Sequence, residues 1–116
     1  MDVLLANPTV MSRERGNAYA FMINEIYALL FFTLEIKSTT QREALSSVMR
    51  FKIDGKIANI QQPYNIPCIV NNNDTLLFCG YLDTQSQGRF ITTPVTWNAN
   101  NTFRISGVAF AQLVSV

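Results

Sequence analysis

Apolar and polar residues alternate along much of the chain, most clearly after residue 47. In residues 49–54, Met49, Phe51 and Ile53 alternate with charged residues, a period of two that indicates a strand with one buried face. This strand runs into Asp54-Gly55, which favours a type I′ hairpin turn because both central positions of that turn need positive φ. Residues 56–60 are therefore expected to form the return strand.

A second hairpin is expected over residues 66–82. The sequence Asn-Asn-Asn-Asp at residues 71–74 separates two apolar runs and is typical of a turn. The run over residues 76–82 is apolar on both faces. This pattern predicts either a central strand in a two-layer core or a strand whose outer side is covered by a partner.

Residues 17–37 carry two competing patterns. The apolar residues within 19–30 fit helical spacing, whereas residues 32–37 alternate as in a strand with one buried face. We expect strands in the second half, with Asn24-Glu25 as a possible turn between two strands. Residues 39–47, which contain several helix formers, are the remaining candidate for a short helix, with a loop as the alternative.

The last third of the chain adds strands over residues 90–97 and 103–110. Val108 and Phe110 keep to the core side only if a β-bulge at Gly107 shifts the parity of the strand. Several short strands separated by turn signals predict a mainly β fold, an antiparallel sandwich or small jelly-roll-like barrel, with at most one short helix in the first half. Residues 17–116 are expected to form one domain, and residues 1–16 an N-terminal arm that reaches a neighbour.

Charged residues make up 15% of the 116 residues, below the typical share of about 25%. The polar residues are instead mainly 11 Asn, 6 Gln, 7 Ser and 10 Thr. Such a surface suits lasting contact with protein, because interface cores are depleted of Lys and Glu. The alternative is an ordinary neutral surface. A net charge of +1 with scattered basic residues argues against nucleic acid as a partner.

The apolar stretch over residues 18–36 is interrupted by Asn24 and Glu25. We therefore expect neither a secretory leader nor a membrane-spanning helix from it, and no membrane partner.

Groups that carry catalysis are scarce in this sequence. The chain has no histidine, which removes the commonest general base and metal ligand. Asp54, Asp74 and Asp83 all fall in expected turns, where a short acceptor side chain stabilises the bend. We expect no enzyme activity, no cofactor and no metal site, and the alternative is an enzyme that uses carboxylates alone.

Cys68 and Cys79 do not form a metal-binding or redox motif. If Val70 pairs with Thr75, Cys68 lies opposite Leu77 and diagonal to Cys79, at a separation too long for an unstrained disulfide. Two buried free thiols are the preferred interpretation, and a shift of register would reopen the question.

Three segments together resemble the later strands of compact jelly-roll heads, such as the complement C1q and tumour necrosis factor-like trimers. They are Phe-Lys-Ile-Asp-Gly-Lys at residues 51–56, Asn-Asp-Thr-Leu-Leu-Phe at 73–78 and Phe-Arg-Ile-Ser-Gly-Val-Ala-Phe at 103–110. Similar β-rich heads occur on phage fibres and decoration proteins. The resemblance covers a little over half of the chain, and residues 19–32 have no counterpart in it.

We therefore expect a non-enzymatic structural protein that forms homo-oligomers and contacts other structural proteins through β-sheet faces. The expected setting is a virion assembled in the host cytoplasm, with a role in head decoration, the tail or the baseplate. The interface candidates are Phe31, Phe32, Leu77, Tyr81, Val114 and Val116.

The alternative is a β-sandwich that binds a carbohydrate or peptide on exposed aromatic and amide side chains. Its candidate ligand-binding residues are Trp97, Asn98, Asn100 and Asn101.

Overall fold

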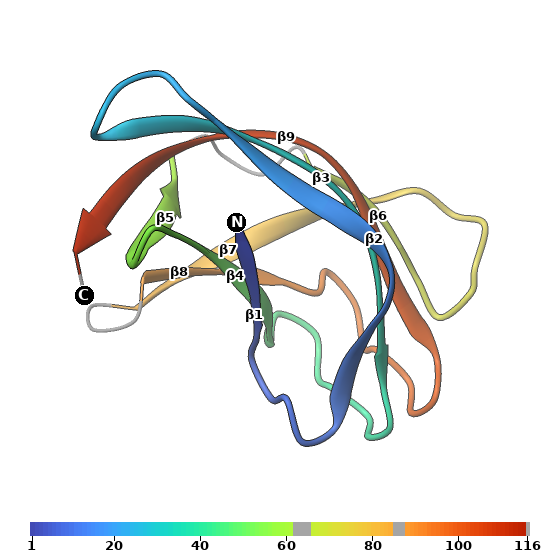
Figure 1. Ribbon diagram of the computed structural model, residues 1–116. Coiled ribbons are helices and arrows are strands. Elements are labelled where there is room, and N and C mark those ends of the chain that lie inside the picture. The colour runs from blue at the N-terminus through green and yellow to red at the C-terminus, as the bar shows by residue number, and fades with distance from the viewer. Residues whose placement is uncertain (62–65, 85–87, 116) are drawn as a thin grey trace.

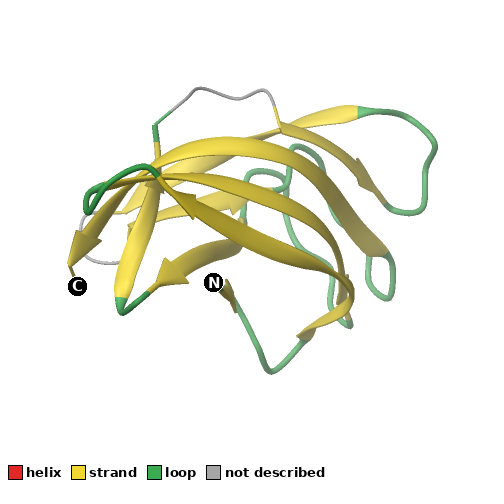
Figure 2. Cartoon of the chain, turned by 45° about the horizontal axis from the view of Figure 1, so that its top comes forward, coloured by secondary structure: helices red, strands yellow, loops and turns green. Residues whose placement is uncertain are grey.

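The computed structural model describes residues 1–61, 66–84 and 88–115, with the side chains of residues 82–84 and 88 left out. Over this part of the chain the structure is mainly β and contains no helix (Figures 1 and 2). Its strands are β1 (Asp2–Leu5), β2 (Met11–Met22), β3 (Tyr27–Ser38), β4 (Ser47–Ile53), β5 (Lys56–Ile60), β6 (Ile66–Val70), β7 (Leu77–Thr84), β8 (Gly88–Thr92) and β9 (Thr102–Ser115).

All strand pairs are antiparallel, and the sheet curls until it closes on itself. The order of the main path is β1-β4-β8-β7-β6-β9-β3-β2, and β5 pairs with both β4 and β9. The long strand β9 is the centre of this arrangement: β3 lies along one side of it, while β6 and β5 share its other side. Strands β1 and β2 are left as the two ends of the path.

Both predicted hairpins are present. Asp54 and Gly55 have φ of 49° and 81°, as a type I′ turn requires, and the turn joins β4 to β5. In the second hairpin Cys68 lies opposite Leu77, the predicted register. Asn24 also forms the predicted turn between β2 and β3, where its Oδ1 accepts hydrogen bonds from the backbone N–H groups of Ile26 and Tyr27 at 2.8 and 2.9 Å.

The core lies between the inner faces of the curled sheet. Phe32 on β3 stacks on Phe51 on β4, with ring centroids 5.2 Å apart, and thereby joins opposite walls. Trp97 is fully buried beside Phe103, at a centroid distance of 5.6 Å, and its Nε1 donates to the carbonyl oxygen of Asn101. This packing anchors the loop between β8 and β9, because burial of a large aromatic ring is worth about 1.5–3 kcal/mol.

Several expectations about local structure are wrong. Residues 1–16 are not an arm, because β1 pairs with β4 and Met11 begins β2. Of the two alternatives for residues 39–47, the helix is absent and the loop is present, with an isolated bridge from Arg42 to Trp97. The strand expected over residues 90–97 ends at Thr92, and Asp83 lies in β7 rather than in a turn.

The predicted bulge at Gly107 is also absent, since the β3–β9 register is unbroken from residue 102 to residue 112. The small residues Ala109 and Ala111 face the core, and Phe110 lies outside, stacked on Tyr27 with ring centroids 5.2 Å apart. Size alone therefore did not decide which residues of β9 are buried. The polar sequence of residues 83–88 also predicts a loop, and residues 85–87 of it lie outside the described residues.

Candidate interaction surface

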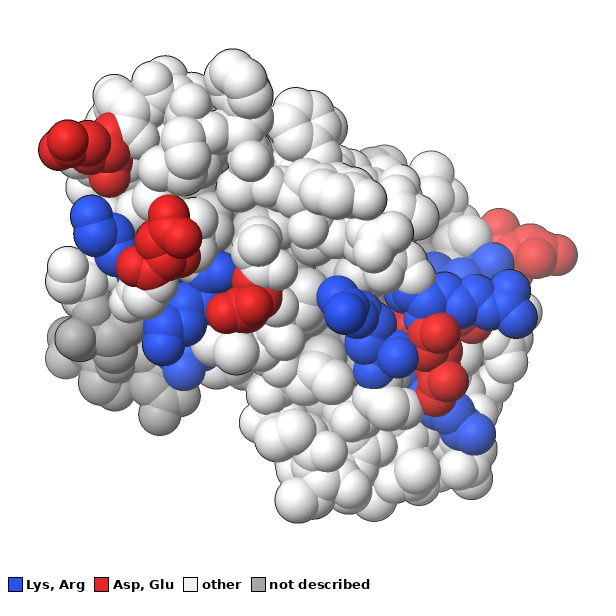
Figure 3. Space-filling view, in the orientation of Figure 1, with Lys and Arg blue, Asp and Glu red and all other residues white. Residues whose placement is uncertain are grey.

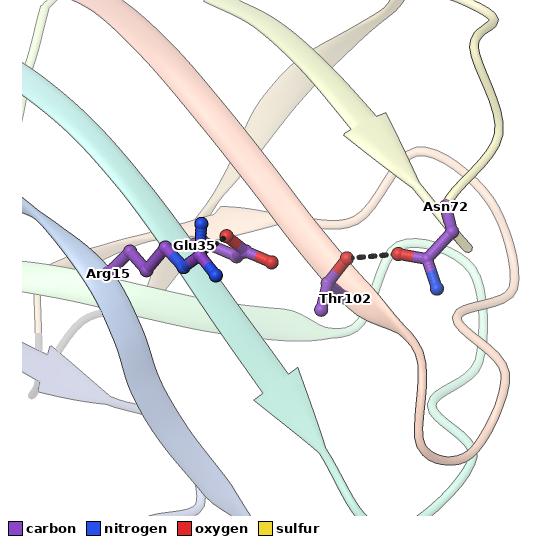
Figure 4. A network of polar contacts seen from close by, with 4 residues as sticks. All are labelled: Arg15, Glu35, Asn72 and Thr102. Carbon is purple, nitrogen blue, oxygen red and sulfur yellow. Dashed lines mark hydrogen bonds and ion pairs between the residues drawn. The ribbon is translucent and has the colours of Figure 1, made fainter.

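The outer face of β2, β3 and β9 changes from charged to apolar at one level across all three strands. Lys37 and Glu35 lie on the charged half of β3. Arg104 on β9 is directly opposite Glu35 in the strand register. Arg15 on β2 forms an ion pair with Glu35, with Nε and Oε2 3.9 Å apart (Figure 4). Because Arg15 is 84% exposed, this pair adds less than about 1 kcal/mol to stability.

A row of hydroxyl groups marks the change. Thr33 on β3 and Ser106 on β9 are directly opposite each other, and their hydroxyl oxygens are 3.1 Å apart in a hydrogen bond. Beyond this row the next two outward residues of each strand are apolar, and on β9 they are followed by the polar Gln112. We call this region the apolar face, and it consists of Tyr19, Phe21, Leu29, Phe31, Val108 and Phe110.

The strand registers make the apolar face continuous. Tyr19 lies opposite Phe31, and Phe31 lies opposite Val108, so one row crosses three strands. A second row runs through Phe21 and Leu29 in the same way. In Figure 3 charged side chains gather at the left and right, and the upper surface between them, over β2, β3 and β9, is white.

The exposure of this face is large for aromatic residues. Tyr19 and Phe21 are each 63% exposed, and Phe31 is 41% exposed. A whole aromatic side chain buries about 150–250 Å², and these three residues would bury the exposed part of that area on contact. Contiguous exposed apolar patches larger than a few hundred Å² are rare in monomeric proteins, and they mark contacts with protein, membrane or ligand.

A hollow of about 460 Å³ borders the charged half of this face. Leu76, Pro67 and Ile69 line one side of it, and Arg15, Glu35 and Arg104 lie on the other. Leu76 and Phe78 are 58% and 54% exposed, so the strand predicted to be apolar on both faces is not sealed by the described residues of the chain. Its inner residue Cys79 is fully buried.

The six interface candidates fall into different environments. Phe31 is on the apolar face. Leu77 and Tyr81 are half-buried against the core, with the Arg89 guanidinium 4.7 Å from the centroid of the Tyr81 ring. Val114 on β9 is half-buried, and Val116 lies outside the described residues.

Phe32 is not available to a partner, because it is 3% exposed and points into the core. In a strand, neighbouring residues face opposite sides of the sheet, and the adjacent Phe31 is the one that points outward. The residues that sequence reasoning missed are Tyr19 and Phe21. The available signal was the near absence of charge between Gly16 and Glu35, where Glu25 is the only charged residue.

The four alternative ligand-binding residues differ in exposure: Trp97 is buried, Asn101 is half-buried, and Asn98 and Asn100 are exposed. Trp97 is fully buried, so the expectation of an exposed ring at this position is wrong. The backbone N–H of Asn98 donates to Asn71 Oδ1 at 2.6 Å, and Asn72 Nδ2 donates to Asn101 Oδ1 at 2.8 Å. Asn100 is exposed, and its backbone N–H donates to the carbonyl oxygen of Ser38.

These amides therefore cross-link two loops. The Thr102 hydroxyl, at the start of β9, donates to Asn72 Oδ1 at 2.5 Å, and Asn72 lies in the turn that follows β6 (Figure 4). Asn71 Nδ2 donates to the carbonyl oxygen of Thr96 at 2.8 Å. Asn71 and Asn72 both have positive φ, a conformation that Asn tolerates better than most residues.

Cys68 and Cys79 are free and buried, and they lie on the paired strands β6 and β7. The hydrogen bond with Cys68, together with burial, raises the pKa of the Cys79 thiol well above its usual range. A thiol with a raised pKa is protonated at neutral pH and is a poor nucleophile.

In the part of the chain that the structure describes, no three His, Cys, Asp or Glu side chains gather in a way that could hold a metal ion. The same residues include no helix able to cross a bilayer. Comparison with family models, curated proteins and solved structures found no match to this chain.

Proposed function

We propose that this protein is a non-enzymatic structural subunit that associates with further protein through its apolar face. The observation that supports the proposal is the position of Tyr19, Phe21 and Phe31, three largely exposed aromatic residues in adjoining rows with no charged residue among them. Burying a fully exposed side chain of this size is worth about 1.5–3 kcal/mol, and covering these rings, which are 41–63% exposed, gives a part of that. The polar and charged half beside it supplies the rim that such interfaces usually have.

The setting that we propose is a virus or phage particle, in which the chain is a head-decoration, tail or baseplate subunit and forms homo-oligomers. The charge-poor composition supports this, as does the compact sheet, which leaves one face for contact. Sequencing of the flanking genes tests the setting: capsid or tail genes on either side would support it, and genes for metabolic enzymes would overturn it.

The association itself is tested by sedimentation velocity and native mass measurement of the purified chain. We expect an oligomer for the unmodified protein and a monomer for Phe31→Asp, because the substitution places a charge at the centre of the apolar face. Leu45→Asp is the matched control, since Leu45 is 69% exposed in a loop away from this face. This control should retain the oligomer.

Circular dichroism of both variants checks that the sheet is intact. A chain that sediments as a monomer at every concentration, with no difference between Phe31→Asp and Leu45→Asp, would overturn the proposal.

A further inference from the structure

We infer that two copies of the chain join edge to edge through antiparallel β2 strands, with Ala20 of one copy opposite Ala20 of the other. The inference rests on the proposed function and deepens it. It names the partner as a second copy, and it places the contact along a strand edge instead of on the apolar face alone.

The first support is the direction of the main-chain groups of β2. The backbone N–H of Ile23 donates to the carbonyl oxygen of Tyr27 on β3 at 2.9 Å. The odd-numbered residues 17–23 therefore direct their main-chain N–H and C=O groups toward β3. The even-numbered residues Ala18, Ala20 and Met22 direct theirs away from β3. Over the described residues no strand pairs with this outer edge of β2, which ends the sheet order (Figure 1).

The second support is the contrast between the two ends of the sheet. Exposed edges are usually protected by short length, charge, proline or a bulge. β1 has four residues and begins with the charged Asp2. β2 has 12 residues, and its charges and register shift are confined to residues 11–16. Residues 17–22, Asn-Ala-Tyr-Ala-Phe-Met, have none of these protections.

The third support is the complementarity that follows from the register. Only residues whose main-chain groups point outward can form the hydrogen-bonded pairs, so Ala20 must face Ala18, Ala20 or Met22 of the partner subunit. The pairing centred on Ala20 sets Tyr19 across from Phe21 of the partner subunit, twice by symmetry. Aromatic pairs on one face of a sheet stabilise it beyond their area alone.

The same register brings Arg15 toward Glu25 of the partner subunit, again twice. Glu25 is exposed in the turn between β2 and β3, and Arg15 is 84% exposed. A shift of two residues in either direction replaces Glu25 with Ile23 or Tyr27 and removes this charge pair. The centred register therefore combines about six main-chain hydrogen bonds with aromatic and ionic pairs.

Site-specific cross-linking tests the register. Ala20→Cys places a cysteine on the two-fold axis, where its Cα lies about 5.5 Å from that of its equivalent, within reach of a disulfide. Ala18→Cys is the matched control: it is a half-buried alanine on the same face of the same strand, but its equivalent lies four residues away along the pair. With diamide as the oxidant, which accepts the two electrons and two protons of the thiols, we expect a covalent dimer for Ala20→Cys only.

Charge exchange gives an independent measurement on the unoxidised protein. Glu25→Arg should weaken the dimer, and Arg15→Glu combined with Glu25→Arg should restore it. Equal cross-linking of both cysteine variants, or of neither, would overturn the inference. If the inferred β2 pairing fails this test but Phe31→Asp still abolishes the oligomer, the proposed function stands without the pairing. A monomeric unmodified chain would overturn both the pairing and the proposed function.

Discussion

Gly16 on β2 lies against the backbone of Thr33 on β3, and its replacement tests this close approach of the two strands. Its φ is +98°, and an added Cβ would lie 1.9 Å from the carbonyl oxygen of Thr33 and 2.8 Å from the carbonyl carbon. Both are main-chain atoms of a paired strand, so they cannot rotate away as a side chain would. Gly16→Ala must therefore separate β2 from β3 locally.

The expected loss of stability has two parts. A positive φ at a residue with a Cβ costs about 1–2 kcal/mol. Separating the strands at Thr33 adds the loss of at least one hydrogen bond and its packing, about 1–2 kcal/mol more. We expect Gly16→Ala to lower the free energy of unfolding by about 3 kcal/mol, a large fraction of the 5–15 kcal/mol typical of a domain.

Gly55→Ala measures the cost of positive φ without the steric clash. Gly55 also has positive φ, +81°, but no atom lies within 4 Å of an added Cβ. Only the conformational cost of about 1–2 kcal/mol should remain. Urea denaturation followed by the fluorescence of the buried Trp97 measures both variants. Equal losses for Gly16→Ala and Gly55→Ala would refute the close approach of the two strands.

Three further predictions follow from burial. Phe32→Ala should lower the free energy of unfolding by about 3–5 kcal/mol, whereas Phe31→Ala should cost about 1 kcal/mol or less; urea denaturation compares them, and similar losses would contradict the assignment of faces. Trp97 fluorescence in the folded chain should be blue-shifted and unchanged by added glycans, because the ring is fully buried; a titration that quenches it would show an accessible ring. Cys68 and Cys79 should resist Ellman's reagent in the folded protein and react fully in urea, and rapid labelling of the native chain would disprove their burial.

Local chemistry was enough to predict the turns at Asn24, at Asp54-Gly55 and after Val70, and the strands that they join. Asp54-Gly55 favours one turn type whatever surrounds it, and Asn24 supplies its own acceptor to the backbone N–H groups that follow. The register that sets Cys68 opposite Leu77 follows from the length of the turn between two apolar runs. Because these features depend on residues near in sequence, the mainly β class could be predicted with them.

The tertiary structure alone decided which of two apolar faces is inside. Phe31 and Phe32 are chemically identical neighbours, and only the pairing of β3 with β9 turns Phe32 to the core and leaves Phe31 on the apolar face. The same long-range pairing buries Ala109 and Ala111, opposite the buried Leu30 and Ala28, and leaves Phe110 on the outer face. Period-two alternation shows which residues of a strand share a face of the sheet. It does not show which face is buried when both faces carry apolar residues. Contacts between segments far apart in sequence supply that choice, and with it the candidate surface.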